Sequence, residues 1–192
     1  MLGSSSTVIK GLEFNFCRTI IGMVKSPVEG NSIVILKMEE PIVFSDFARP
    51  ICIPENDEAF INPNSSASHC VTLGWTLEGE ELTQVSIRPT NQNVCEEMSE
   101  VSANTICTEE DTEPGIPCIG EEFAGAPLLC QHRDHWYLTG VLAWRKGCST
   151  VGQRPRLYDR VAVTSDWANK VMLKLNDNTS QRIPRRKQHK LS

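Results

Sequence analysis

The chain has 192 residues, of which 40% are hydrophobic and 22% are charged, and its net charge is −5. That length and apolar content suffice to bury a sizeable core, so a globular protein is expected. Five cations crowd the last eleven residues, so the body is more acidic than the total, which argues against a nucleic-acid partner. No apolar run is long enough to span a bilayer, so no transmembrane segment is expected.

Short β-branched runs recur between turn residues and predict an all-β barrel or sandwich. In chain order, the expected strands are 18–24, 32–38, 70–75, 82–89, 136–144 and 156–163. One helix is expected near the end, where Trp167, Val171 and Leu175 recur at helical spacing. Ser165 precedes them as the expected N-cap.

Two segments lack the periodicity of a strand or a helix. Residues 54–69 are rich in Pro, Asn and Ser, which predicts a connector between two halves of the chain. Residues 176–192 are polar and basic, and a disordered tail is favoured there over a heparin-binding or processing site.

Eight cysteines are spread at wide spacings, without the CxxC pairs that a zinc site or a redox motif needs. This spacing indicates disulfides and therefore a secreted, extracellular protein. Asn64 and Asn178 begin glycosylation sequons, which agrees with that location. The first residues lack the basic start and apolar core of a signal peptide, so either an upstream part precedes Met1 or export follows another route.

Five motifs, in order, resemble those of the trypsin/chymotrypsin family of serine proteases. "NSIVILKMEEPIVFSDFARPICIP" (31–54) is similar to "NDIALLKLxxPVxFSDxVRPICLP", and "CVTLGW" (70–75) to "CxVTGWG". "PCIGEEFAGAPLLC" (117–130) stands where the family has "CxGDSGGPL". "GVLAWRKGCS" (140–149) resembles "GIVSWGxGCA", and "PRLYDRVAVTSDWANKV" (155–171) resembles "PGVYTRVxxYxxWIxxxI".

The resemblance implies a fold of two orthogonal six-stranded β-barrels followed by a C-terminal helix. The implied trypsin-like domain covers 1–175, with a first barrel lacking its early strands in 1–53, the connector in 54–69, and the second barrel and helix in 70–175, before the tail 176–192.

Disulfides are also implied by the resemblance, and they pair Cys70 with Cys130, Cys95 with Cys107, and Cys118 with Cys148. Cys52 stands where family members often bond to an upstream chain or pro-segment. Cys17 has no counterpart in the family motifs.

Family members cleave peptides with a serine that is activated by a histidine, which an aspartate orients. The aspartate of "NDIALL" is replaced by Ser32, which cannot supply the charge that stabilises an imidazolium. The histidine of "AAHC" would lie upstream of Met1, and none of the four histidines of this chain stands in such a context. The aspartate and the histidine of the family's catalytic triad are therefore both expected to be missing from this chain.

No nucleophile is found in 117–130 by either way of counting. Counted back from Gly125, the serine position is Ala124; counted forward from Cys118, it is Glu122. Two inserted residues should also disturb the backbone amides that hold the oxyanion.

The residues at the specificity-pocket positions also differ from those of the family motifs. Ile116 stands where trypsins have an aspartate, Ala143–Arg145 replaces the wall "SWG", and Arg156 replaces the glycine of "PGVY". Because glycine there permits close approach, two long cations are expected to block the slot.

Two clusters raise the question of a metal site. His132 and His135 lie in a hairpin beside Cys130, whose thiol the implied disulfide uses, and a closed site needs four ligands. The acidic run 109–113 lacks the glycine-spaced loop of a calcium site. The chain also has no glycine loop of the kind that cradles phosphates, so neither a metal nor a cofactor is expected.

These departures predict a catalytically inactive trypsin-like pseudoprotease that binds or regulates a protein partner. One alternative is a serine-type endopeptidase carried by a longer chain of which this is a part. The other is a truncated product without stable function, because an incomplete first barrel leaves an open strand edge.

Overall fold

The computed structural model describes residues 18–46, 48–62, 69–75, 82–95, 101–110, 124–145 and 155–177. The strands are β1 Ile20–Lys25, β2 Val34–Met38, β3 His69–Trp75, β4 Leu82–Pro89, β5 Thr105–Glu110, β6 Pro127–His132, β7 His135–Arg145 and β8 Arg156–Arg160. The helices are α1 Glu58–Ile61, η1 Gln92–Cys95, η2 Ala162–Thr164 and α2 Ser165–Asp177, where η marks a 3-10 helix.

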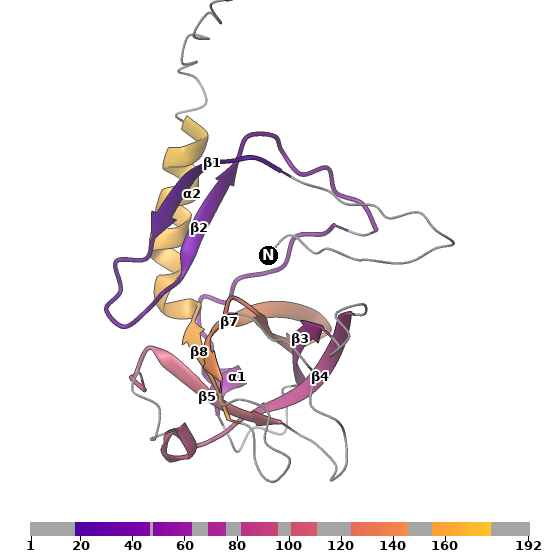
Figure 1. Cartoon of the computed structure of the whole chain (residues 1–192), viewed down its shortest axis with the longest axis vertical. Helices are drawn as coiled ribbons and strands as arrows, with labels where there is room; N and C mark the ends of the chain where they lie inside the picture. The colour runs from indigo at the N-terminus through magenta and orange to yellow at the C-terminus, as the bar shows by residue number, and fades with distance from the viewer. Residues whose placement is uncertain are drawn as a thin grey trace, which may run out of the picture.

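Six strands form a closed antiparallel barrel in the order β3-β4-β5-β8-β7-β6 (Figure 1). It closes because β3 pairs with both β4 and β6, which leaves no free edge among these six strands. Inward-facing side chains from the barrel strands, joined by Phe60 of α1 and by Ala126, make one buried core. The mostly β architecture, with its closed barrel, partial sheet and C-terminal helix, confirms the expected fold class.

Gly140 lets β7 and β8 approach closely within this barrel. A Cβ atom at Gly140 would lie 2.8 Å from the Cβ of Tyr158 and 3.3 Å from that of Leu128. Real Cβ atoms do not approach so closely, so only glycine fits at the start of the "GVLAW" motif.

The β6–β7 hairpin turns through Arg133 and Asp134, whose φ angles are 47° and 66°. Two successive left-handed residues are typical of a type I′ turn, whose twist matches that of the flanking strands. This turn fixes the pairing of His132 with His135 directly across the hairpin.

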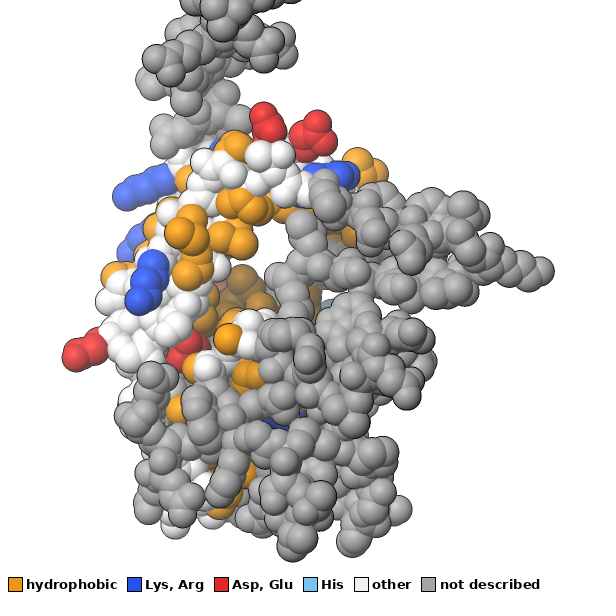
Figure 2. Space-filling view, in the orientation of Figure 1, with side chains coloured by type: hydrophobic (Ala, Val, Ile, Leu, Met, Phe, Trp, Pro, Cys, Tyr) orange, Lys and Arg blue, Asp and Glu red, His pale blue; other side chains and the backbone are white. Residues whose placement is uncertain are grey.

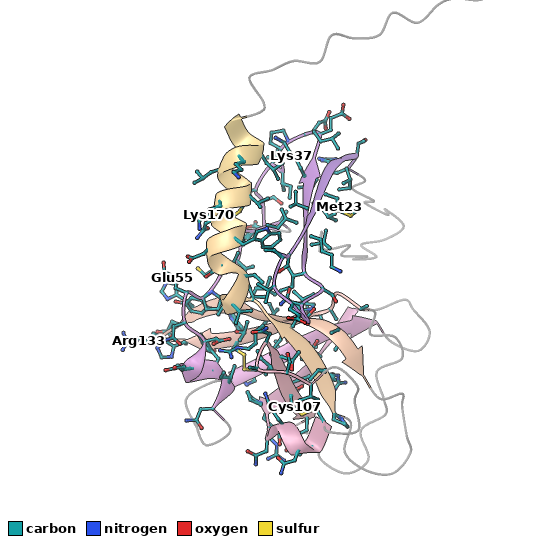
Figure 3. All side chains as sticks on the ribbon, turned by 90° about the vertical axis from the view of Figure 1, so that its left-hand side faces the viewer. Met23, Lys37, Glu55, Cys107, Arg133 and Lys170 are labelled. Carbon is teal, nitrogen blue, oxygen red and sulfur yellow. A yellow bond between two sulfur atoms is a disulfide. The ribbon has the colours of Figure 1, made fainter. Side chains whose placement is uncertain are left out.

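Strands β1 and β2 form a separate two-stranded antiparallel ribbon, which lies beside α2 (Figures 1 and 3). One face meets the helix, because the Nζ of Lys37 donates to the carbonyl of Leu175. The other face carries Ile21, Met23 and Leu36, each more than half exposed. Met23 points away from α2 in Figure 3, as the alternation of side chains along a strand requires.

Helix α2 begins without the expected cap. Ser165 has helical angles, φ −58° and ψ −47°, and is the first residue of the helix, so the assignment of Ser165 as N-cap is wrong. The reason is that η2 leads directly into α2, with the Thr164 hydroxyl donating to the carbonyl of Val161. The same turn ends the expected strand 156–163 at Arg160. None of the described helices is long and apolar enough to cross a membrane.

Candidate functional site

Ser32, at the expected aspartate position, lies in the turn that leads into β2. Its backbone N–H donates to Oδ2 of Asp159 at 2.7 Å. Asp159 belongs to β8 and is only 3% exposed. Position 32 therefore carries no carboxylate of its own, but a buried carboxylate from another strand contacts its backbone.

Neighbouring polar contacts fasten this turn to the barrel. Asn31 is buried, and its Nδ2 donates to the carbonyl of Arg160 at 3.3 Å, while its Oδ1 accepts from the N–H of Ile33 at 3.1 Å. From the barrel side, the Nδ2 of Asn104 donates to the carbonyl of Glu29 at 3.1 Å. The ribbon turn is thus held on β8 and on the loop before β5.

Ala124 is exposed at the turn that precedes β6. The next residue, Gly125, has φ +97°, and its N–H donates to the carbonyl of Leu142 at 2.8 Å. Leu142 in turn donates to the carbonyl of Ala126 at 2.8 Å. This turn presents a methyl group at position 124, while Ile116, Glu121, Glu122 and Phe123 lie outside the described residues.

The pairing of β7 with β8 brings the contacts of Ser32 and of Gly125 to neighbouring strands of the barrel. Val141 of β7 pairs with Asp159, which contacts Ser32. Leu142, the next residue of β7, accepts the hydrogen bond from Gly125. Ser32 therefore contacts β8, and Gly125, the residue after Ala124, contacts the neighbouring strand β7.

Arg156 opens β8 and is 2% exposed. It pairs with Thr108 of β5, whose hydroxyl donates to the Arg156 carbonyl at 3.4 Å. A long cation therefore occupies buried space where the motif has glycine. The side chains of Trp144 and Arg145 are not among those described.

An ion pair joins the connector to β8. The guanidinium of Arg160 donates to both carboxylate oxygens of Asp57, at 2.9 and 2.5 Å, and to the carbonyl of Ala103 at 2.9 Å. The hydrogen bonding to Asp57 raises the pKa of Arg160, and burial opposes this only in part. Asp57 directly precedes α1, and its carbonyl accepts from the N–H of Phe60 in that helix.

Two disulfides lie among the described residues, and both are pairs that the motifs imply. Cys70–Cys130 joins β3 to β6, and Cys95–Cys107 joins η1 to β5. Cys52 is exposed and is the free cysteine of the described part. Cys17, the Cys118–Cys148 pair, Asn64 and Asn178 lie outside the described residues.

The histidines of the β6–β7 hairpin make local contacts. Nδ1 of His135 lies 2.9 Å from the carbonyl of Arg133, and the ring of His132 meets that of Phe60 edge-on at 5.8 Å. Within the described ranges, no three His, Cys, Asp or Glu side chains are grouped so that they could hold a metal ion.

Asp159 is the residue of this site that motif reading misses. Its signal in the sequence is a replaced threonine in the closing motif, three positions after the replaced glycine at Arg156. An aspartate in a predicted strand does not by itself indicate a functional site. Its contact with Ser32, 127 positions away, gives it significance.

A family model described as Trypsin matches residues 10–168 of the chain. The matched range is more than half of the 192 residues and includes every described strand and the beginning of α2.

Proposed function

The chain belongs to the trypsin family, and we propose that it is a catalytically inactive member that acts as a protein-binding or regulatory module. The observation that carries the proposal is Ala124. It lies directly before Gly125, whose N–H donates to the carbonyl of Leu142 in β7. Its side chain is only a methyl group, where an acyl-transfer enzyme needs a nucleophile.

Two further observations support the same proposal. Ser32 has no carboxylate to orient and stabilise an imidazolium. The buried Arg156 takes up space where the family pocket needs a small residue, so a substrate side chain has less room to enter.

The ribbon supports a binding role. Figure 2 shows apolar side chains gathered over β1 and β2, where Ile21, Met23 and Leu36 are strongly exposed. Large contiguous apolar patches are rare on the surface of monomeric soluble proteins, and where they occur they usually mark interaction sites. The expected ligand is therefore another protein. The disulfides of this chain support a secreted location, where that partner would be met.

The first prediction tests the missing nucleophile. A serine-directed phosphonate should not label the chain, and peptides with arginyl, aromatic or small residues at the cleavage site should not be turned over. Intact-mass measurement after labelling and a peptide hydrolysis assay would show this. Stoichiometric labelling that disappears with one serine substitution would instead support an endopeptidase that uses a serine other than position 124.

The second prediction asks whether the site is damaged or wholly lost. Ala124→Ser alone should give no measurable hydrolysis, because a serine hydroxyl without an adjacent base is a weak nucleophile. Adding Ser32→Asp should still give none, since triad members act as a unit that supplies roughly 10⁶-fold in rate. The unmutated chain, prepared in parallel, sets the background. Clear hydrolysis by the double variant would show that a working base and oxyanion hole are present.

A further inference from the structure

The face of the ribbon that points away from α2 carries a continuous apolar surface. Met23 of β1 pairs with Leu36 of β2, so these two side chains lie next to each other on that face. Val34 lies two positions before Leu36 and shares its face by strand alternation. The ribbon patch consists of Ile21, Met23, Val34 and Leu36, which are between 38% and 72% exposed.

Charges of opposite sign lie at the two ends of the ribbon patch. Lys25 ends β1 and pairs with Val34, so its side chain lies on the patch face, at the end next to the turn. Glu39 and Glu40 directly follow β2 and are exposed at the other end, where they outnumber Arg18. We propose that the ribbon patch binds the same patch of a second copy of this chain, with the two ribbons running in opposite directions. This arrangement sets Lys25 of each copy opposite the two glutamates of the other. The proposal rests on the proposed binding role and names its partner.

The attachment of the ribbon to the barrel limits the direction in which a second ribbon can lie. The turn between β1 and β2 is fastened to the barrel, since Asn104 donates to the carbonyl of Glu29, and the rest of the ribbon stands clear of the barrel (Figure 1). A second ribbon running in the same direction would bring its barrel against the first barrel and set like charges together. The opposite direction separates the two barrels and gives a two-fold symmetric contact, which is the commonest form of a homodimer.

The size of the ribbon patch indicates a weak contact. Four partly exposed apolar side chains from each copy bury less surface than a standard protein interface, so the dimer should form only as the concentration rises. Met23 has the most surface to bury, because it is 72% exposed, and its flexible side chain adapts to the surface that it meets. Burial of the patch therefore supplies the affinity, while the charges at its ends set the direction.

Sedimentation equilibrium over a range of protein concentrations tests the apolar contact. The unmutated chain should pass from monomer to dimer. Met23→Lys should weaken the dimer by at least about tenfold, because each copy would bury an unpaired ammonium group. The matched control is Leu173→Lys, which changes a side chain that is 67% exposed on α2, outside the patch, and should leave the dimer unchanged. Cys52→Ser should also leave it unchanged, which excludes a dimer formed through the exposed thiol.

A charge exchange tests the direction of the two ribbons. Lys25→Glu should weaken the dimer about tenfold, because the new carboxylate would face the glutamates of the other copy. The variant E39K/E40K should weaken it similarly, and K25E/E39K/E40K should return to within about threefold of the unmutated chain, because the pairs form again with their signs reversed. Lys170→Glu changes the net charge as much as K25E does. Lys170 points away from the ribbon in Figure 3, so this control should have no effect.

The proposal has clear failing results. A chain that stays monomeric at every concentration, or a dimer that M23K leaves intact, would overturn it. A triple variant as weak as K25E would overturn the opposite direction of the ribbons and, with it, the proposed dimer. None of these results bears on the missing nucleophile, so failure of the dimer and failure of the proposed inactivity are distinguishable.

Discussion

Replacing Asp57 with alanine should lower the free energy of unfolding by about 3 kcal/mol, because it leaves the guanidinium of Arg160 in place without its carboxylate. The side chain of Asp57 is 2% exposed and that of Arg160 is 22% exposed, so water replaces the lost partner only in part. Arg160 stays charged in the variant, since guanidinium groups do not deprotonate in proteins. The cost is that of a guanidinium at the end of β8 that has lost its counter-ion.

A matched ion pair on the surface provides the control. Arg49 and Asp46 lie 2.6 Å apart, but both side chains are largely exposed, so Asp46→Ala should cost about 0–1 kcal/mol. Urea unfolding of the two variants gives the comparison. Equal losses for D57A and D46A would mean that the Asp57 pair is as well hydrated as a surface pair. Replacing both partners, as in D57A/R160M, should recover part of the loss, because no unpaired charge remains.

The barrel was partly predictable from local pattern. The expected strands 70–75, 82–89 and 136–144 lie within β3, β4 and β7, where β-branched and aromatic residues are dense. Strand β5 was not expected, because it ends in two glutamates. One of them, Glu109, is buried, and its Oε1 lies 3.1 Å from Nη2 of Arg88, the residue opposite it on β4. The periodicity of the sequence cannot reveal such a partner.

Helix α1 was missed for a different reason. Its four residues cover about one helical turn, which is too short for an apolar repeat to show, and it lies inside the expected connector 54–69. What holds its start is Asp57, whose side chain binds Arg160, 103 positions further along the chain. Such a partner is invisible in a window of the sequence.

The candidate site likewise contains residues that the sequence could identify and one that it could not. Ser32 could be located because it stands at a fixed place in a recognisable motif, whereas the serine position falls on Ala124 or on Glu122 according to the direction of counting. Asp159 could not be assigned a role, because its role depends on a contact between β8 and a turn 127 positions away. Motif reading finds a residue that departs from a pattern; only the fold shows which other departure it meets.

Removing the Cys70–Cys130 disulfide should be more damaging than removing Cys95–Cys107. The first links positions 60 apart and the second positions 12 apart. In the chain-entropy description, a longer closed loop restricts the unfolded chain more, giving about 4 kcal/mol for the first and about 3 kcal/mol for the second. Both alanine double variants also lose packing, because Cys70 and Cys130 belong to the main barrel core and Cys95 and Cys107 belong to a smaller buried cluster, so the difference in loop length carries the expected order.

Reduction without mutation separates the two contributions. Urea unfolding of the reduced chain keeps both thiols in the core and therefore measures the effect of the closed loops, while C70A/C130A also removes the sulfur atoms. The alanine double variant should lose more stability than C95A/C107A, and reduction of the C95A/C107A variant should report the Cys70–Cys130 loop together with any bond outside the described residues. Equal losses for the two double variants would show that neither loop length nor core position governs stability. In that case the barrel would be held by its strand pairing, with Cys70 and Cys130 acting only as small core residues.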